Sequence, residues 1–164
     1  HYPLRRQRQM CIRDSICAAL WADWWGFKHE AYDMSIANVA IVDQARNGQG
    51  CAIVHSDSEN GIQRLNQEAA KALSAGREAG FEISDARAIT WLTKNPAIAA
   101  GILEQTGTIE IGKNADIVVW SGHPLSVYSK ADQVYIDGAL TFDRLNNFMP
   151  HTDFDLGIEL WESE

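Results

Sequence analysis

The stretch Cys51-Ala-Ile-Val-His-Ser-Asp-Ser-Glu-Asn-Gly61 decides the fold class, because a short apolar run leads directly into a polar loop that carries carboxylates. The run 51–54 is too short for a helix and shows no alternation, which is typical of a parallel strand covered on both faces. Asp57 follows just beyond this predicted strand. Parallel α/β folds place their chemistry at the carboxyl ends of strands, so the loop is the candidate functional site.

Amphipathic segments flank this strand and predict a repeating β–α pattern. Apolar residues at helical spacing predict one helix over 30–46 and a second over 62–79, with Gly48 or Gly50 ending the first. The apolar run 16–20 is a candidate strand upstream of both. We therefore expect an α/β fold in this part of the chain.

Two shorter helical segments are expected next. Ser84 reads as the N-cap of a third helix. Asn95 reads as the N-cap of a short turn that begins at Pro96 and is closed by Gly101.

The composition then becomes rich in β-branched residues. Strands are predicted over 107–111, 116–120, 133–136 and 139–142. The pair Asp137-Gly138 separates the last two runs and is a strong signal for a tight hairpin. A small antiparallel β element is therefore expected, with its boundary near 102–107.

The net charge of the chain argues against a nucleic-acid partner. The chain of 164 residues carries 14 Lys plus Arg against 22 Asp plus Glu, a formal net charge of -8. An acidic surface repels phosphate backbones, and four of the 14 basic residues crowd into the first 15 positions. Residues 1–15 also resemble a translated sequencing adapter, so we exclude this artefactual or disordered leader from the fold.

The remaining composition points to a soluble domain that is not bound to a membrane. No run approaches the roughly 18 apolar residues of a membrane span, and no signal-peptide architecture is visible. The expected location is cytoplasmic or periplasmic, with the true N-terminus missing.

The three cysteines, Cys11, Cys17 and Cys51, follow no metal-ligand spacing and are interpreted as reduced packing thiols.

An aromatic loop, Trp21-Ala-Asp-Trp-Trp-Gly-Phe27, follows the first candidate strand. One interpretation is that its rings cover a barrel mouth or a missing part of the protein. The other is a lid facing substrate, because concave binding sites are often lined by aromatic residues. The sequence leaves both open.

Asp57 is the candidate catalytic residue and metal ligand. On an extended segment His55 and Asp57 share one face, whereas Ser56 points away, so these neighbours do not form a catalytic triad. A carboxylate in this position serves as a metal ligand or a general base, and both roles need partners. No histidine pair has metal-binding spacing, so an equally open alternative is that Asp57 only caps the following helix.

Several motifs together resemble the C-terminal third of the amidohydrolase superfamily, in particular its imidazolonepropionase-like, metal-dependent hydrolases. They are His55-Ser-Asp57, Asn95-Pro-Ala97, Gly101-Ile102, Gly107-Thr-Ile-Glu-Ile-Gly-Lys-Asn-Ala-Asp-Ile-Val-Val-Trp120 and Val134-Tyr-Ile-Asp-Gly138. The resemblance covers about 16–144. It implies the end of a (β/α)8 TIM barrel over 16–104 and a portion of a β-sandwich over 105–144. Residues 145–164 show no firm periodicity and are predicted from their acidic side chains to form a solvated tail.

The resemblance also implies a mechanism. In this superfamily the carboxylate after the eighth barrel strand binds a divalent metal, expected to be zinc, and moves the proton of a water that attacks an amide or ring C–N bond. Asp57 occupies the matching position. His55 is expected to support that site from outside or to line the pocket. The family's other metal ligands have no counterpart, so the fragment is expected to be inactive without the missing N-terminal part. The resemblance implies a small-molecule substrate. The alternative to an enzyme is a non-enzymatic α/β interaction module in which Asp57 only caps a helix.

Overall fold

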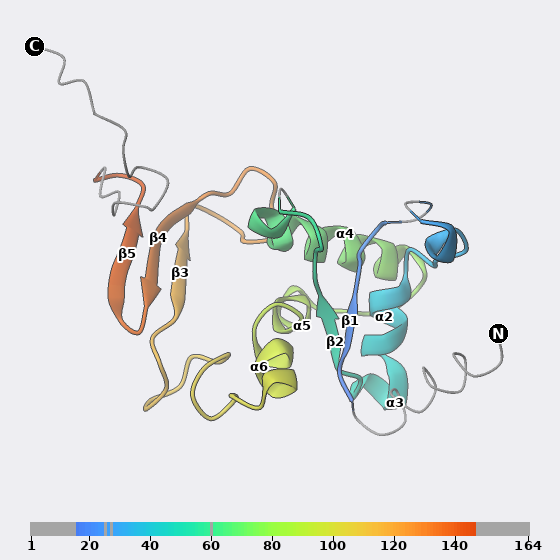
Figure 1. Cartoon of the computed structure of the whole chain (residues 1–164), viewed down its shortest axis with the longest axis horizontal. Helices are drawn as coiled ribbons and strands as arrows, with labels where there is room; N and C mark the ends of the chain where they lie inside the picture. The colour runs from blue at the N-terminus through green and yellow to red at the C-terminus, as the bar shows by residue number, and fades with distance from the viewer. Residues whose placement is uncertain (1–15, 25, 27, 60, 147–164) are drawn as a thin grey trace, which may run out of the picture.

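Two short parallel strands form the centre of the α/β part (Figure 1). The structure, a computed structural model, describes residues 16–24, 26, 28–59 and 61–146. Strand β1 (Ala18–Leu20) pairs with β2 (Ala52–Val54), with Ala18 opposite Ala52 and Leu20 opposite Val54. Both predicted strands are therefore present and parallel.

The segment between β1 and β2 differs from the single helix predicted over 30–46. It contains η1 (His29–Ala31), α2 (Asn38–Asp43) and α3 (Ala45–Gly48). Arg46, Asn47 and Gly48 have φ of 55°, 59° and 81°, so the right-handed helix ends before them. Left-handed backbone is costly for residues with a Cβ, and helical spacing of apolar side chains does not reveal it.

Gly50 is required by close backbone contact rather than by its own φ. A Cβ at this position would lie 1.7 Å from the carbonyl oxygen of Val42, at the end of α2. Only a residue without a side chain at position 50 therefore lets the chain pass this close to the end of α2 before it enters β2.

Helix α4 (Leu65–Glu78), preceded by η2 (Ile62–Arg64), confirms the second predicted helix. It packs closely on α2, because a Cβ at Gly76 would lie 2.6 Å from the Cβ of Ala40. Helix α5 (Asp85–Thr90) begins as predicted, with the Ser84 hydroxyl accepting the Arg87 N–H at 3.1 Å.

Helix α6 (Lys94–Ala100) starts earlier than predicted, since its N-cap is Thr93 and not Asn95. Asn95 is buried and donates through Nδ2 to the Ala52 carbonyl at 2.7 Å. The N–H of Val54 donates to the Trp91 carbonyl at 3.3 Å. The segment 91–95 therefore satisfies backbone groups on the edge of β2 that faces away from β1, a role that local capping rules do not predict.

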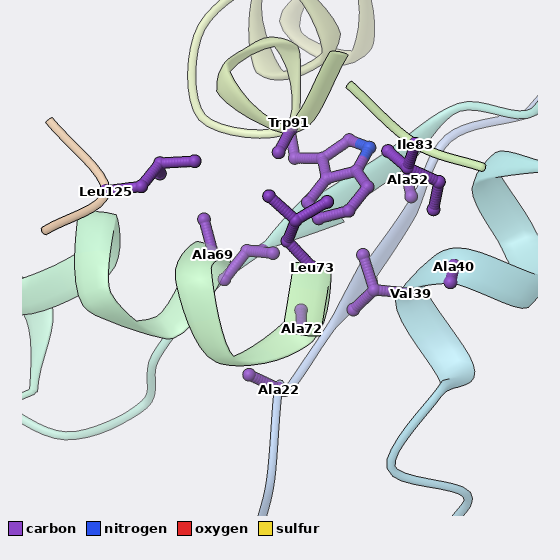
Figure 2. Packing of buried hydrophobic residues seen from close by; sticks show 12 residues of the cluster. Ala22, Val39, Ala40, Ala52, Ala69, Ala72, Leu73, Ile83, Trp91 and Leu125 are labelled. Carbon is purple, nitrogen blue, oxygen red and sulfur yellow. The ribbon is translucent and has the colours of Figure 1, made fainter. Parts of the chain in front are cut away.

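The hydrophobic core lies between α2, α4, α5 and β2. Figure 2 shows Trp91, Leu73 and Val39 gathered beside the small residues Ala52, Ala69 and Ala72. Trp91 and Val39 have no exposed surface. The many alanines let α4 approach the strands closely, and the Trp91 indole fills the space that remains.

A disulfide joins Cys17 and Cys51, which corrects the interpretation of these residues as reduced thiols. They immediately precede β1 and β2, so the parallel register sets them side by side with their Cα atoms 4.5 Å apart. That distance lies in the range of disulfide-bonded pairs. Their separation of 34 residues gives no local signal for such a pairing. Cys11 and the rest of 1–15 lie outside the described residues.

The C-terminal part is a three-stranded antiparallel sheet in the order β3-β4-β5, to the left of the α/β part in Figure 1. It comprises β3 (Ile117–Trp120), β4 (Ala131–Ile136) and β5 (Ala139–Asp143). Asp137 and Gly138 both have positive φ, 50° and 78°, which confirms the hairpin.

The strand predicted over 107–111 is wrong. Those residues form turns and irregular chain, and the side chains of Ile109 and Ile111 are exposed. β-branched residues favour a pleated, half-buried surface, and no described strand lies beside this segment to provide one.

The connection between β3 and β4 fastens the sheet to the α/β part. Leu125 is 9% exposed and belongs to the same core as Leu73. Asn66 Nδ2 in α4 donates to the Pro124 carbonyl at 2.7 Å.

None of the described helices combines the length and apolar character needed to cross a bilayer.

Candidate active site at the carboxyl ends of β1 and β2

The loops that leave β1 and β2 meet at one edge of the parallel pair. The N–H of His55 donates to the Leu20 carbonyl at 3.1 Å, which extends the strand pairing by one step. Trp21 and His55 consequently stand side by side directly after the strands. This register places the aromatic loop next to the carboxylate-bearing loop.

The structure brings His55 and Asp57 together, as their spacing on an extended segment predicts. His55 Nδ1 lies 3.3 Å from Asp57 Oδ1. The Asp57 side chain is 58% exposed and that of His55 is 33% exposed. The carboxylate is therefore open to a ligand while one of its oxygens faces an imidazole nitrogen.

Asp57 does not occupy a helix N-cap position. The residues at the N-caps of η2 and α4 are Gly61 and Arg64. The alternative prediction, that Asp57 is present to cap the next helix, does not agree with this geometry. Its side chain is directed instead to the His55 imidazole.

The turn that follows Asp57 is fixed by its own hydrogen bonds. The Ser56 hydroxyl accepts the Ser58 N–H at 3.1 Å, and the Gly61 N–H donates to the Ser58 carbonyl at 3.0 Å. A Cβ on Gly61 would lie 2.6 Å from Ser56 Oγ. Gly61 thus lets the turn fold back close to Ser56 on the amino-terminal side of Asp57.

The aromatic loop contributes two described indoles to this edge. The Trp21 ring centroid lies 5.9 Å from that of His55 and 5.4 Å from that of Trp24. Lys28 Nζ lies 5.5 Å from the Trp21 ring centroid. Trp25 and Phe27 lie outside the described residues. Sequence reasoning missed the contact of Trp21 with His55, although parallel pairing of the two preceding strands would have indicated it.

An ion pair holds the aromatic loop against α4. Lys71 Nζ lies 2.9 Å from Asp23 Oδ2 and 2.7 Å from Glu68 Oε1. Burial alone would lower the pKa of Lys71, but its hydrogen bonds to Glu68 and Asp23 outweigh burial and leave that pKa above its ordinary value. The charged form of Lys71 is therefore favoured, and the tether persists at neutral pH.

A complete metal site is not formed by the described residues. No group of three or more His, Cys, Asp or Glu side chains converges among them. Asp57 fits one ligand position, because it is an exposed carboxylate at a strand end. His123 lies elsewhere, with Nε2 3.0 Å from Asp85 Oδ2, and His1 and His151 lie outside the described residues.

An open hollow of about 600 Å³ lies between α4 and the segment 123–126, away from Asp57. In its lining Asp85 already contacts both Arg77, at 2.7 Å, and His123. We therefore assign the candidate site to the strand ends and not to this hollow.

Comparison with known proteins agrees with the motifs and the fold. Residues 40–146, more than half of the chain, match the amidohydrolase family. The chain is 33% identical over 126 residues to amidohydrolase tasK of Hapsidospora irregularis, covering 76% of this chain and 12% of that protein. It is 48% identical over 40 residues to imidazolonepropionase of Brucella suis, covering 24% of this chain and 10% of that protein.

A solved structure is also similar. The amidohydrolase from Thermotoga maritima MSB8 superposes with a TM-score of 0.68 at 28% identity, over 85% of this chain and 34% of that chain. The chain thus spans about a tenth of the curated relatives and a third of the solved one. On the family match and the shared fold, the chain belongs to the amidohydrolase family.

Proposed function

We propose that this chain is the C-terminal part of a metal-dependent hydrolase that cleaves an amide or cyclic amide C–N bond, with Asp57 as its catalytic residue. The observation that carries the proposal is the exposed Asp57 carboxylate just beyond the carboxyl end of β2, in contact with His55. Similarity to an imidazolonepropionase supports a small cyclic substrate, since an imidazolone ring contains such a bond.

Asp57 is assigned two tasks, the transfer of a proton and the binding of a metal ion. A divalent metal, proposed to be zinc, would supply Lewis acidity and lower the pKa of a bound water. Asp57 would provide one oxygen ligand, accept the proton of the attacking water and return a proton to the leaving nitrogen. His55 would hold one carboxylate oxygen in place, which leaves the other free for these tasks.

The proposed architecture follows the length relationship. We assign β1 and β2 to the last strands of a (β/α)8 barrel over 16–104, and β3 to β5 to a β-sandwich portion over 105–144. Because the chain spans 34% of the Thermotoga maritima amidohydrolase, the remaining metal ligands are proposed to lie in an N-terminal part of the same protein. The fragment alone is then proposed to be inactive. For the whole protein we propose neither a nucleic-acid nor a membrane partner, and a location in the cytoplasm or periplasm.

The test is hydrolysis of cyclic and linear amides by the full-length protein that contains this chain. Asp57→Asn removes the proton acceptor but keeps the shape of the side chain, so kcat should fall by roughly 10² or more. Glu59→Gln is the matched control, because Glu59 is an exposed carboxylate two residues further on. Undiminished hydrolysis by Asp57→Asn would refute the assignment and favour the non-enzymatic interaction module.

A further inference from the structure

We propose that Trp21 is a positioning residue, whose indole holds the His55 imidazole so that Nδ1 faces the Asp57 carboxylate. The inference rests on the proposed function, because it gives Trp21 a role only through the proton chemistry of Asp57. This role differs from both interpretations of the aromatic loop, the cover and the lid facing substrate.

The backbone on both sides of the contact is fixed. His55 N–H donates to the Leu20 carbonyl at 3.1 Å, directly before Trp21. The Trp21 carbonyl accepts a hydrogen bond of 3.0 Å from Nδ2 of Asn38, the first residue of α2. Trp21 therefore cannot slide relative to His55 without breaking a hydrogen bond to a strand or a helix.

The Trp21 ring is itself held by other side chains. Its plane is inclined by 31° to that of Trp24 at a centroid distance of 5.4 Å, a distance at which aromatic pairs attract. Lys28 Nζ lies 5.5 Å from the Trp21 centroid, within the range of a cation–π contact. An indole packed in this way is a rigid platform for a third ring.

That third ring is the His55 imidazole, 5.9 Å from the Trp21 centroid and inclined by 36° to it. The terminal torsion of histidine is broad, so a free imidazole samples several orientations. Contact with the indole restricts this rotation. The orientation that it favours places Nδ1 3.3 Å from Asp57 Oδ1.

Asp57 depends on this arrangement because its side chain is 58% exposed and packing does little to fix it. Its orientation is set by the contact with His55 and by the hydrogen-bonded turn. A displacement of about 1 Å in a catalytic group can cost on the order of 10² in rate. Trp21 is thus expected to affect kcat without contacting the reacting atoms.

The experiment measures the reactivity of His55 and turnover in the same variants of the full-length protein. Diethyl pyrocarbonate acylates accessible imidazole nitrogens, and peptide mass spectrometry gives the rate at each histidine. Trp21→Leu removes the aromatic face, and Trp21→Phe retains one. Trp120→Leu is the matched control, because Trp120 lies in β3, outside the contacts around His55. His123 is the internal standard.

In Trp21→Leu we expect the acylation rate of His55 to rise several-fold relative to His123, and kcat to fall roughly 10- to 100-fold with KM little changed. Trp21→Phe should restore both values most of the way. Equal acylation in Trp21→Leu and wild type would overturn the proposal, as would an equal rise at His123. If Trp21→Leu does not fold, Trp21→Met replaces it with the same expectations.

Asp57→Asn, measured beside these variants, separates this inference from the proposed function. If Asp57→Asn abolishes hydrolysis but Trp21→Leu changes neither readout, only the positioning role fails. If Asp57→Asn retains full hydrolysis, the proposed function fails, whatever the acylation rates show.

Discussion

Arg87 Nε donates to Asp43 Oδ1 at 2.8 Å, joining α5 to the end of α2 across 44 residues of sequence. The same oxygen accepts the Trp91 indole N–H at 2.7 Å, and Oδ2 accepts Gln44 Nε2 at 2.8 Å. Arg87 Nη2 also donates to the carbonyls of Gly48 and Gly50. One buried carboxylate and one guanidinium therefore fix the chain at the point where it enters β2 and leads to the candidate site.

Replacing Asp43 by Ala is expected to destabilise the protein by about 3 kcal/mol, because it leaves the Arg87 guanidinium without its counter-charge and the buried Trp91 N–H without its acceptor. Urea unfolding followed by circular dichroism measures the change. Glu110→Gln removes a carboxylate that is 61% exposed and should leave the midpoint within error of wild type. Equal midpoints for Asp43→Ala and wild type would show that the cluster adds nothing to stability.

Such long-range relationships mark the limit of what the sequence predicts. The β2 run, the α4 periodicity, the Ser84 cap and the Asp137-Gly138 turn are local signals, and the structure confirms each of them. Here a few neighbouring residues determine the backbone, because their side chains or missing side chains favour one conformation.

The predictions that failed depended on distant partners. Asn95 has the character of an N-cap, but its amide is used by the Ala52 carbonyl on β2. Ile109 and Ile111 favour a strand, but the described sheet ends at β3. At the site, the sequence indicated His55 and Asp57, whereas the contribution of Trp21 became visible only with the register of β1 and β2.

The disulfide between Cys17 and Cys51 predicts a dependence of stability on reductant. It closes a loop with a sequence separation of 34, for which chain-entropy estimates give roughly 3 to 4 kcal/mol. Reduction should therefore lower the unfolding midpoint of wild type. Cys17→Ser should have the lower midpoint with or without reductant, while Cys11→Ser should respond like wild type. Alkylation of Cys17 and Cys51 in the unreduced, unfolded protein would contradict the pairing.

The turn around Asp57 predicts a compensating pair of substitutions. Gly61→Ala introduces a Cβ 2.6 Å from Ser56 Oγ, so the hydroxyl must rotate away and lose the Ser58 N–H. The expected cost is about 1 kcal/mol. In a Ser56→Ala background the clash is absent, and the same substitution should cost much less. A double-mutant cycle by thermal unfolding measures the coupling. Equal costs in the two backgrounds would show that Ser56 does not constrain Gly61.

Asp116 predicts acid sensitivity in the C-terminal sheet. Its carboxylate accepts the Asp137 backbone N–H at 3.0 Å and the Thr106 hydroxyl at 2.7 Å, and these bonds, the first above all, lower the pKa of Asp116 below 3.8. Because the folded-state pKa is depressed, the stabilisation is fully present above the unfolded value. It is lost as pH falls through the lower, folded-state value.

Asp116→Asn should therefore be less stable than wild type at pH 6 and should lose less stability between pH 6 and pH 3. Asp137→Asn is the matched control: the turn needs positive φ at this position, which Asn tolerates, and the bond to Asp116 uses the backbone N–H of residue 137. It should keep the wild-type dependence on pH. The pKa of Asp143 is also lowered, first by its hydrogen bond from Gln133, and this adds the same loss of stability in acid to all three proteins. Urea midpoints at several pH values measure the slopes, and parallel slopes for Asp116→Asn and wild type would remove Asp116 from the acid response.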